Sequence, residues 1–241
     1  MPLLSLSNLT KHYGALAVTD DLSLDVSSHE IVGILGPNGA GKTTLFNLIA
    51  GTVQPDRGTV SFDGNDLTAQ SASARCRKGI SRSFQIPNPF GGMTVFENVL
   101  VGATFGRAHQ RNDPAQRAAE VLVLTGLKPK ANVLAGSLTL LERKRLEMAR
   151  ALATDPKLLL LDEIAGGLTD PECRSLLAAI RDVHASGVSI VWIEHVVHAL
   201  LSVAQRLVVV NFGRKIAEGL PAAVMANPEV QSVYMGDADH V

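Results

Sequence analysis

One short segment, GPNGAGKT at residues 36–43, constrains the fold more than any other part of the sequence. It matches the pattern G-x-x-x-x-G-K-[ST], follows the apolar run Ile31–Leu35, and precedes a helical pattern over Thr43–Ala50 that ends at a glycine. Glycines let the backbone curl so that successive N–H groups point into one concavity, and the following helix adds its positive end. A strand, a glycine loop and a helix in this order therefore predict an α/β fold with a polyphosphate site.

Within this segment, which we call the phosphate loop, two side chains carry the expected chemistry. Lys42, expected on an exposed loop, can reach the terminal phosphates, and the Thr43 hydroxyl can ligate Mg²⁺. The alternative is a chance glycine turn before a helix, but the motif and its context agree on a phosphate site. The residues assigned to nucleotide binding here are Gly36, Pro37, Asn38, Gly39, Ala40, Gly41, Lys42, Thr43 and Thr44.

The composition excludes several classes of protein. The 241 residues suffice for one large domain or a core with an attached subdomain, and 46% hydrophobic against 19% charged residues favour a buried core over disorder. A formal net charge of -1 lacks the basic excess of a nucleic-acid-binding protein. Cys76 and Cys173 lie far apart in the sequence and suit a reducing compartment. We see no signal-peptide pattern and no apolar run of about 18 residues, so any membrane role is expected to be peripheral.

Apolar runs alternate with helical patterns along the chain. Ile31–Leu35, Leu158–Leu161 and Val188–Ile193 carry few charges and predict strands buried on both faces, as in a parallel sheet. Pro114 and Pro171, each of which follows an aspartate, mark helix starts. We therefore expect a P-loop NTPase core with a mostly parallel sheet.

Other regions follow different patterns. Ser5–Ser27 and Gly58–Asp66 contain short alternating segments and predict an N-terminal antiparallel β subdomain. Residues from about 87 to 150 show helical patterns without a clear strand, which predicts a helical subdomain inserted in a single domain of residues 1–241. A hairpin is predicted near the end of the chain, where Arg206–Val210 and Lys215–Glu218 flank Asn211, Phe212 and Gly213.

Two acids follow the apolar run LLLL. An acid at the carboxyl end of a buried parallel strand projects into the ligand crevice. Asp162 would then hold Mg²⁺ through water, and Glu163 would orient or deprotonate an attacking water. A strand that ends in two solvated acids is the ordinary alternative, but the phosphate loop earlier in the chain favours the catalytic interpretation.

Three single residues give weaker signals. Gln85 follows a possible strand end, His195 follows the apolar run Val188–Ile193, and Tyr13 is an early aromatic that could stack on an adenine. Each also has an ordinary structural interpretation, respectively a surface glutamine, a structural histidine, and a ring packed under the small sheet. Taken singly, none of them identifies a site.

Residues 137–150, SLTLLERKRLEMAR, predict the start of an amphipathic helix. Thr139 and Glu142 have the spacing of a capping box, in which the hydroxyl and the carboxylate each accept a hydrogen bond from a backbone N–H at the helix start. The sequence therefore predicts a helix start that is satisfied by its own side chains.

The order of these motifs resembles the ATP-binding subunit of ABC transporters, from Leu4 to about Gly236. The resemblance implies ATP and Mg²⁺ as cofactors. It implies that Gln85 lies in the Q-loop, where it contacts nucleotide and metal, and that Asp162 and Glu163 form the second acidic motif. It also implies that His195 is the switch histidine and that Tyr13 stacks on the adenine.

Four stretches narrow the resemblance further. The stretches that are most similar to the ATPases of branched-chain amino acid importers are FGGMTVFENVL, RLEMARALATDPKLLLLDE, IEH and GRKIAEG. Similar stretches occur in lipopolysaccharide-export ATPases of comparable length, so export stays an alternative. The solute itself is not encoded, because a nucleotide-binding subunit never touches it.

The chain departs from this family at the signature motif, which usually reads LSGGQ. The aligned residues here are Leu138, Thr139, Leu140, Leu141 and Glu142. Leucine adds bulk where the partner's phosphate would approach, and Glu142 adds a negative charge near another, so we expect weakened phosphate binding. The alternative is that the leucines point aside and the helix still receives phosphate. Two further departures are Ile164 in place of a proline and Thr169 in place of the aspartate of the D-loop.

The resemblance implies a peripheral ATPase on the cytoplasmic side of the plasma or inner membrane. Two ATP-binding subunits would sandwich two ATP molecules, and the degenerate signature favours a homologous second subunit over a second copy. Integral membrane permease subunits would be direct partners, a solute-binding protein an indirect one, and nucleic acid none. A soluble ABC protein that acts on nucleic acid or ribosomes is less favoured, because such proteins normally carry long coiled-coil insertions or tandem cassettes.

Overall fold

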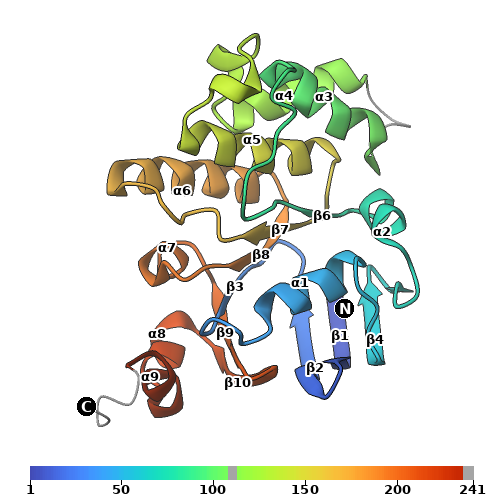
Figure 1. The fold of residues 1–241 in the computed structure, drawn as a ribbon, viewed down its shortest axis with the longest axis vertical. Coiled ribbons are helices and arrows are strands. Elements are labelled where there is room, and N and C mark those ends of the chain that lie inside the picture. The colour runs from blue at the N-terminus through green and yellow to red at the C-terminus, as the bar shows by residue number, and fades with distance from the viewer. Residues whose placement is uncertain (108–112, 236–241) are drawn as a thin grey trace. The chain divides into compact units, whose positions relative to one another are not determined.

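A computed structural model of the protein describes residues 1–107 and 113–235. These residues form two compact units (Figure 1). The first unit contains Met1–Ala72 and the chain from Val191 onward, and the second contains Ser73–Ile190. Strand β8 (Ser189–Ile193) runs from the second unit into the first.

The N-terminal part of the first unit is an antiparallel sheet with the strand order β2-β1-β4-β5. Leu4, Leu6 and Leu9 of the first strand are almost fully buried, while polar side chains between them are more exposed. This alternation buries one face of the sheet and confirms the antiparallel region predicted from the sequence. The strands are β1 (Leu4–Tyr13), β2 (Leu16–Val26), β4 (Arg57–Phe62) and β5 (Asn65–Asp66).

The second part of the first unit carries the phosphate loop. β3 (Ile31–Leu35) is buried at all five positions and pairs in parallel with β9 (Arg206–Asn211). β9 turns back into β10 (Arg214–Gly219), which pairs with it antiparallel and confirms the predicted hairpin, drawn in orange-red in Figure 1. The helices of this unit are α1 (Lys42–Ala50), α7 (Val197–Leu201), α8 (Pro221–Met225) and α9 (Pro228–Met235).

The second unit combines a parallel strand pair with helices. β6 (Ile80–Arg82) pairs in parallel with β7 (Leu158–Asp162), and Ser189 at the start of β8 donates its N–H to the Lys157 carbonyl (3.0 Å). The helices are α2 (Ala72–Lys78), α3 (Val95–Phe105), α4 (Pro114–Leu124), α5 (Leu140–Ala153) and α6 (Asp170–Ala185), with 3-10 turns at Lys128–Lys130 and Ala135–Ser137.

Helix-start signals of the sequence explain several of these boundaries. Asp113 caps α4 by accepting from the Ala115 N–H (2.9 Å), with Pro114 in the first turn, as predicted. At α6 the cap is Thr169 and not the aspartate before Pro171, because Asp170 is already the first helical residue. Within the described part of the chain, no helix is long and apolar enough to cross a membrane.

The described residues of 87–150 contain α3, α4, both 3-10 turns and most of α5, and these three helices pack against one another. Residues 108–112 of this predicted helical region lie outside the described residues. That it forms a subdomain inserted in one domain of residues 1–241 stays a prediction.

Candidate functional site

The phosphate loop connects β3 to α1, as its sequence context predicted. Gly39 and Gly41 have φ of 80° and 98°, in the left-handed region that residues with a Cβ rarely adopt. Gly41 is the N-cap of α1, and the first turn of that helix carries no acidic residue and no side-chain cap in the described structure. A helix start of this kind offers backbone N–H groups and a positive dipole end to an anion.

Lys42 is not on an exposed loop, and that expectation is wrong. It is the first residue of α1, its exposed fraction is only 6%, and its ammonium donates to the carbonyls of Gly36 (2.6 Å) and Pro37 (2.9 Å). The side chain folds back over the loop because these carbonyls accept strong charge-assisted hydrogen bonds. Thr43 is exposed and Thr44 is buried, so of the two hydroxyl groups that of Thr43 is open to solvent.

Two weaker candidates also belong to the first unit. Tyr13 ends β1 with its ring half exposed, and the Lys11 ammonium lies 5.9 Å from the ring centroid. His195 is exposed, and its backbone N–H donates to the buried Glu194 carboxylate (3.0 Å). The Glu194 backbone N–H donates to the Ile34 carbonyl (3.4 Å), so the residue before His195 is hydrogen-bonded to β3.

The second unit holds the two acids. Asp162 ends β7 with 3% of its surface exposed, and its carboxylate accepts from the Arg82 guanidinium (2.5 Å). Its backbone N–H donates to the Ser83 hydroxyl (3.3 Å). The carboxylate of the expected metal ligand is therefore oriented by the residue at the end of β6.

Glu163 follows Asp162 in a left-handed conformation, with φ of 47°. Non-glycine residues rarely adopt this conformation, and such strain often occurs at functional sites. The Gln85 amide nitrogen donates to the Glu163 carboxylate, and the Lys144 ammonium donates to the Glu163 carbonyl (3.3 Å). The structure thus brings Gln85 and Glu163 together, as expected for parts of one site.

Arg82 and Lys144 were missed by the sequence reasoning. Each is a single basic residue without a motif, and each meets its acid or carbonyl only through the packing of distant segments. Arg82 precedes Gln85 by three positions, but nothing in its spacing identifies Asp162 as its partner.

The start of α5 confirms the predicted capping box. The Glu142 carboxylate accepts from the Thr139 N–H (2.9 Å), the Thr139 hydroxyl accepts from the Glu142 N–H (3.4 Å), and Lys130 pairs with Glu142 (3.1 Å). The Thr139 N–H and Lys130 together hold the pKa of Glu142 below its ordinary value against the opposing effect of burial. Leu140 is 43% exposed and lies beside Gly167.

The three expected Mg²⁺ ligands, Thr43, Gln85 and Asp162, all offer oxygen, which is the donor that Mg²⁺ prefers. The bond from Gln85 to Glu163 uses the amide nitrogen and leaves the amide oxygen out of it. Among the described residues, no group of three or more His, Cys, Asp and Glu side chains is placed to hold a metal ion. Hydroxyl, amide and carboxylate oxygens are ligands that Mg²⁺ accepts beside water and phosphate oxygens, so the chemistry of each residue fits this ion.

Comparison with known families and proteins gives consistent matches. Residues 19–166 match the ABC transporter family, and residues 214–240 match the family of branched-chain amino acid ATP-binding cassette transporters. The chain is 34% identical to the high-affinity branched-chain amino acid transport ATP-binding protein BraF of Pseudomonas aeruginosa, over 98% of this chain and 99% of BraF. It is 35% identical to the lipopolysaccharide export system ATP-binding protein LptB of Haemophilus influenzae, over 98% of each chain.

Solved structures agree with the sequence matches. A nucleotide-free ATP-binding cassette from an ABC transporter superposes with a TM-score of 0.89 at 29% identity, over 98% of this chain and 100% of that one. The ADP conformation of the cassette MJ1267 gives a TM-score of 0.89 at 30% identity, with the same coverage. The fold, the ordered motifs and these near full-length matches together show that the chain belongs to the ATP-binding subunits of the ABC transporter family.

Proposed function

We propose that this chain binds ATP and Mg²⁺ at the phosphate loop and hydrolyses ATP to drive the import of branched-chain or related amino acids, or of similar small polar solutes. The observation that carries ATP binding is the start of α1. Left-handed glycines lead into a helix without a side-chain cap or an acid in its first turn, and this is the arrangement that a polyphosphate requires.

Each proposed role follows from the chemistry of a side chain. The Lys42 ammonium would move from the loop carbonyls to the terminal phosphates, which are stronger acceptors. Glu163 would act as the general base or orient the water, while Gln85 holds its carboxylate. His195 would sense the γ-phosphate, and Tyr13 would stack on the adenine.

Thr43, Gln85 and Asp162 would hold Mg²⁺, with Asp162 acting through water. When bound, the ion would neutralise charge on the phosphate oxygens during transfer. In the described structure Arg82 fixes one oxygen of the Asp162 carboxylate, so the orientation of this ligand does not depend on solvent.

Import is favoured over export by one observation. The match to branched-chain amino acid cassettes over residues 214–240 adds to the near full-length similarity to BraF. The alternative is a lipopolysaccharide-type export ATPase, supported by 35% identity to LptB. A soluble ABC protein with no transport role is less favoured.

In this proposal the chain works at the cytoplasmic side of the membrane as a peripheral subunit. Its partners would be a second, homologous ATP-binding subunit and integral membrane permease subunits, with a solute-binding protein as an indirect partner. Purification from membranes tests these assignments. Two permease subunits with a homologous ATPase support import, whereas lipopolysaccharide-export components contradict it.

The hydrolytic role is tested by Glu163→Gln, which keeps the shape and hydrogen bonding of the side chain but removes the base. A general base contributes about 10²–10⁴-fold, so we expect turnover by the assembled complex to fall at least about 100-fold while ATP binding survives. Glu120→Gln, at an ion-paired exposed position on α4, is the matched control and should hydrolyse at the wild-type rate. Wild-type turnover by Glu163→Gln would remove Glu163 from the mechanism.

A further inference from the structure

The tip of the β9–β10 hairpin contacts the phosphate loop through the backbone. The Gly213 N–H donates to the carbonyl of Ala40 (2.9 Å), which lies within the loop. The Gly213 carbonyl in turn accepts from the Asp20 N–H (3.0 Å) of β2. One residue far from the motif in sequence thus links the loop to the antiparallel sheet.

The packing at this point leaves no room for side chains. Gly213 has φ of 76°, and a Cβ placed there would lie 2.7 Å from the Val18 carbonyl oxygen and 3.0 Å from the Thr19 Cα. On the loop side, a Cβ at Gly41 would collide with the same Val18 oxygen, and one at Gly36 would collide with the Val210 oxygen. The loop, β2 and the hairpin therefore meet backbone to backbone.

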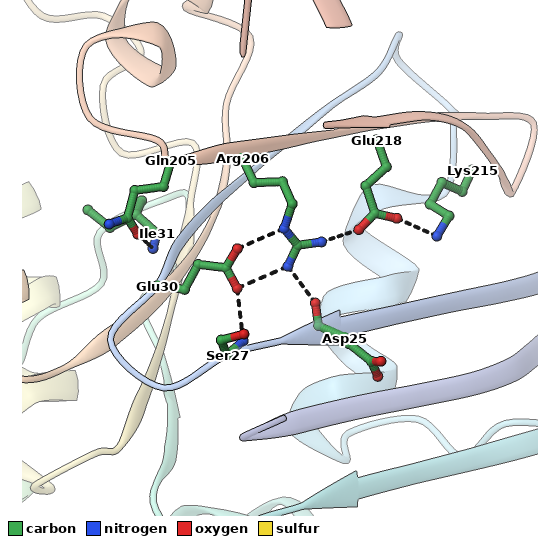
Figure 2. Close-up of polar contacts among 8 residues, drawn as sticks. All are labelled: Asp25, Ser27, Glu30, Ile31, Gln205, Arg206, Lys215 and Glu218. Atoms are coloured by element: carbon green, nitrogen blue, oxygen red, sulfur yellow. Dashed lines mark hydrogen bonds and ion pairs between the residues drawn. The ribbon is translucent and has the colours of Figure 1, made fainter. Parts of the chain in front are cut away.

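Ion pairs fix the hairpin at both ends. At the tip, Arg214 donates from Nε to the Asp20 carboxylate (2.8 Å). At the base, Arg206 donates to both Glu30 oxygens (2.7 and 3.0 Å) and to the Asp25 carbonyl (2.6 Å), and it also pairs with Glu218 (Figure 2). Burial would raise the pKa of Glu30, but the hydrogen bonds from Arg206 and the Ser27 N–H outweigh it and keep that pKa below its ordinary value.

We infer that Gly213 is a positioning residue for nucleotide binding. By holding the Ala40 carbonyl toward the hairpin, it keeps the loop in the conformation that turns its N–H groups toward phosphate. The loop is then ordered before the ligand arrives, and binding does not have to supply that ordering. This inference rests on the proposed ATP site and concerns how that site is built.

The test is Gly213→Ala, with Gly64→Ala as the matched control. Gly64 lies in the β4–β5 turn with φ of 75°, and a Cβ there would meet nothing within 4 Å. Both substitutions place alanine in a similar left-handed conformation, but only Gly213→Ala collides with β2 and so displaces the hairpin tip that bonds the Ala40 carbonyl. We expect the Kd for MgATP, measured by calorimetric titration, to rise at least about tenfold for Gly213→Ala and less than about twofold for Gly64→Ala.

Steady-state kinetics of the assembled complex separate positioning from simple destabilisation. The KM for ATP should rise for Gly213→Ala while kcat at saturating ATP stays within about twofold, because the catalytic groups are untouched. If Gly213→Ala binds MgATP like the wild type, or if both alanine variants lose the same affinity, the inference is wrong. If the wild-type chain itself binds no ATP, the proposed function fails instead.

If Gly213→Ala does not fold, Arg214→Ala tests the inference in its place. Arg214 is exposed and lies outside the loop, so its removal weakens only the attachment of the hairpin tip to Asp20. We expect a two- to fivefold rise in the KM for ATP, partly restored in Arg214→Lys, which keeps the positive charge. An unchanged KM in Arg214→Ala would overturn the inference in that case.

Discussion

The starts of α1 and α5 are built in opposite ways, although the sequence marks both as helix starts. At α1 the N-cap is Gly41, with no side-chain cap and no acid in the first turn of the described helix. At α5 Thr139 and Glu142 cap each other's N–H groups, and Lys130 pairs with the carboxylate. The first start can offer its N–H groups to an anion, whereas the second has engaged two of them and adds a negative charge.

The capping box of α5 is not an isolated device in this protein. α3 begins with the pair Thr94 and Glu97, and α6 begins with Thr169 and Glu172, in the same arrangement. A capping box is thus a repeated way to begin a helix in the second unit, and α1 differs from it. A helix start can receive phosphate when it has neither a side-chain cap nor an acidic residue in its first turn. α1 meets both conditions, whereas α5 meets neither.

The largest expected effect comes from Lys42→Ala, which removes the only positive side chain in the first turn of α1. We expect the affinity for MgATP to fall at least about 100-fold, because the charge-assisted contacts to the phosphates are lost. Since Lys42 is buried against two loop carbonyls, thermal unfolding must be measured beside the ATP titration. Lys78→Ala, at an exposed position at the end of α2, is the control.

The outcome separates two explanations. A folded Lys42→Ala protein without ATP affinity supports the open helix start as the phosphate site. Unchanged ATP affinity would contradict the assignment of that site and leave α1 and α5 equivalent.

The sequence predicted those features of both helix starts that depend on local spacing. The glycine pattern placed the loop between β3 and α1, and Thr139 and Glu142 gave the capping box. It did not predict that Lys42 is buried, because its acceptors depend on how the loop curls. It also missed the contacts of Arg82 with Asp162 and of Lys144 with Glu163, whose partners come together only through the fold.

The next effect concerns the asymmetry that the two helix starts imply for a pair of ATP-binding subunits. If α5 is a poor phosphate reader, the chain should work with a homologue that carries an intact LSGGQ. The site that joins this chain's phosphate loop to that intact signature should then carry most turnover. In the assembled complex we therefore expect Glu163→Gln to lower steady-state ATPase activity at least about 100-fold, and the equivalent change in the partner to lower it less than about twofold.

The reverse change sharpens the same prediction. Replacing Leu140 and Leu141 by glycine and Glu142 by glutamine removes bulk and charge from the start of α5, so hydrolysis at the second site should rise. Equal losses from the two Glu→Gln changes would count against the asymmetric pair. Robust ATP-driven dimerisation and turnover by this chain alone would also count against the asymmetric pair. In that case Leu140 and Leu141 would have to point away from the phosphate of the second subunit's ATP.

The smallest expected effect is a change in the free energy of unfolding when the capping box of α5 alone is removed. Thr139→Ala should cost about 1 kcal/mol, which lowers the thermal midpoint of a chain of this size by about 2–4 °C. Gly41→Ala cannot serve as its counterpart, because Gly41 has φ of 98° and a Cβ there would collide with the Val18 carbonyl.

The pH dependence of the same cap follows from Glu142. Its pKa in the folded protein lies below the ordinary value of 4.5, because the Thr139 N–H and Lys130 favour the carboxylate. A depressed folded pKa gives stability that is fully present above pH 4.5 and is lost as the pH falls through the folded value.

The stability difference between wild type and Glu142→Gln should therefore shrink as the pH is lowered from 7 to about 3, measured by thermal unfolding. Glu97→Gln serves as the control, because the hydrogen bonds from Thr94 alone hold the pKa of the Glu97 carboxylate below its ordinary value, without a lysine such as Lys130. A difference for Glu142→Gln that stays constant or grows in acid would mean that the carboxylate does not stabilise the start of α5.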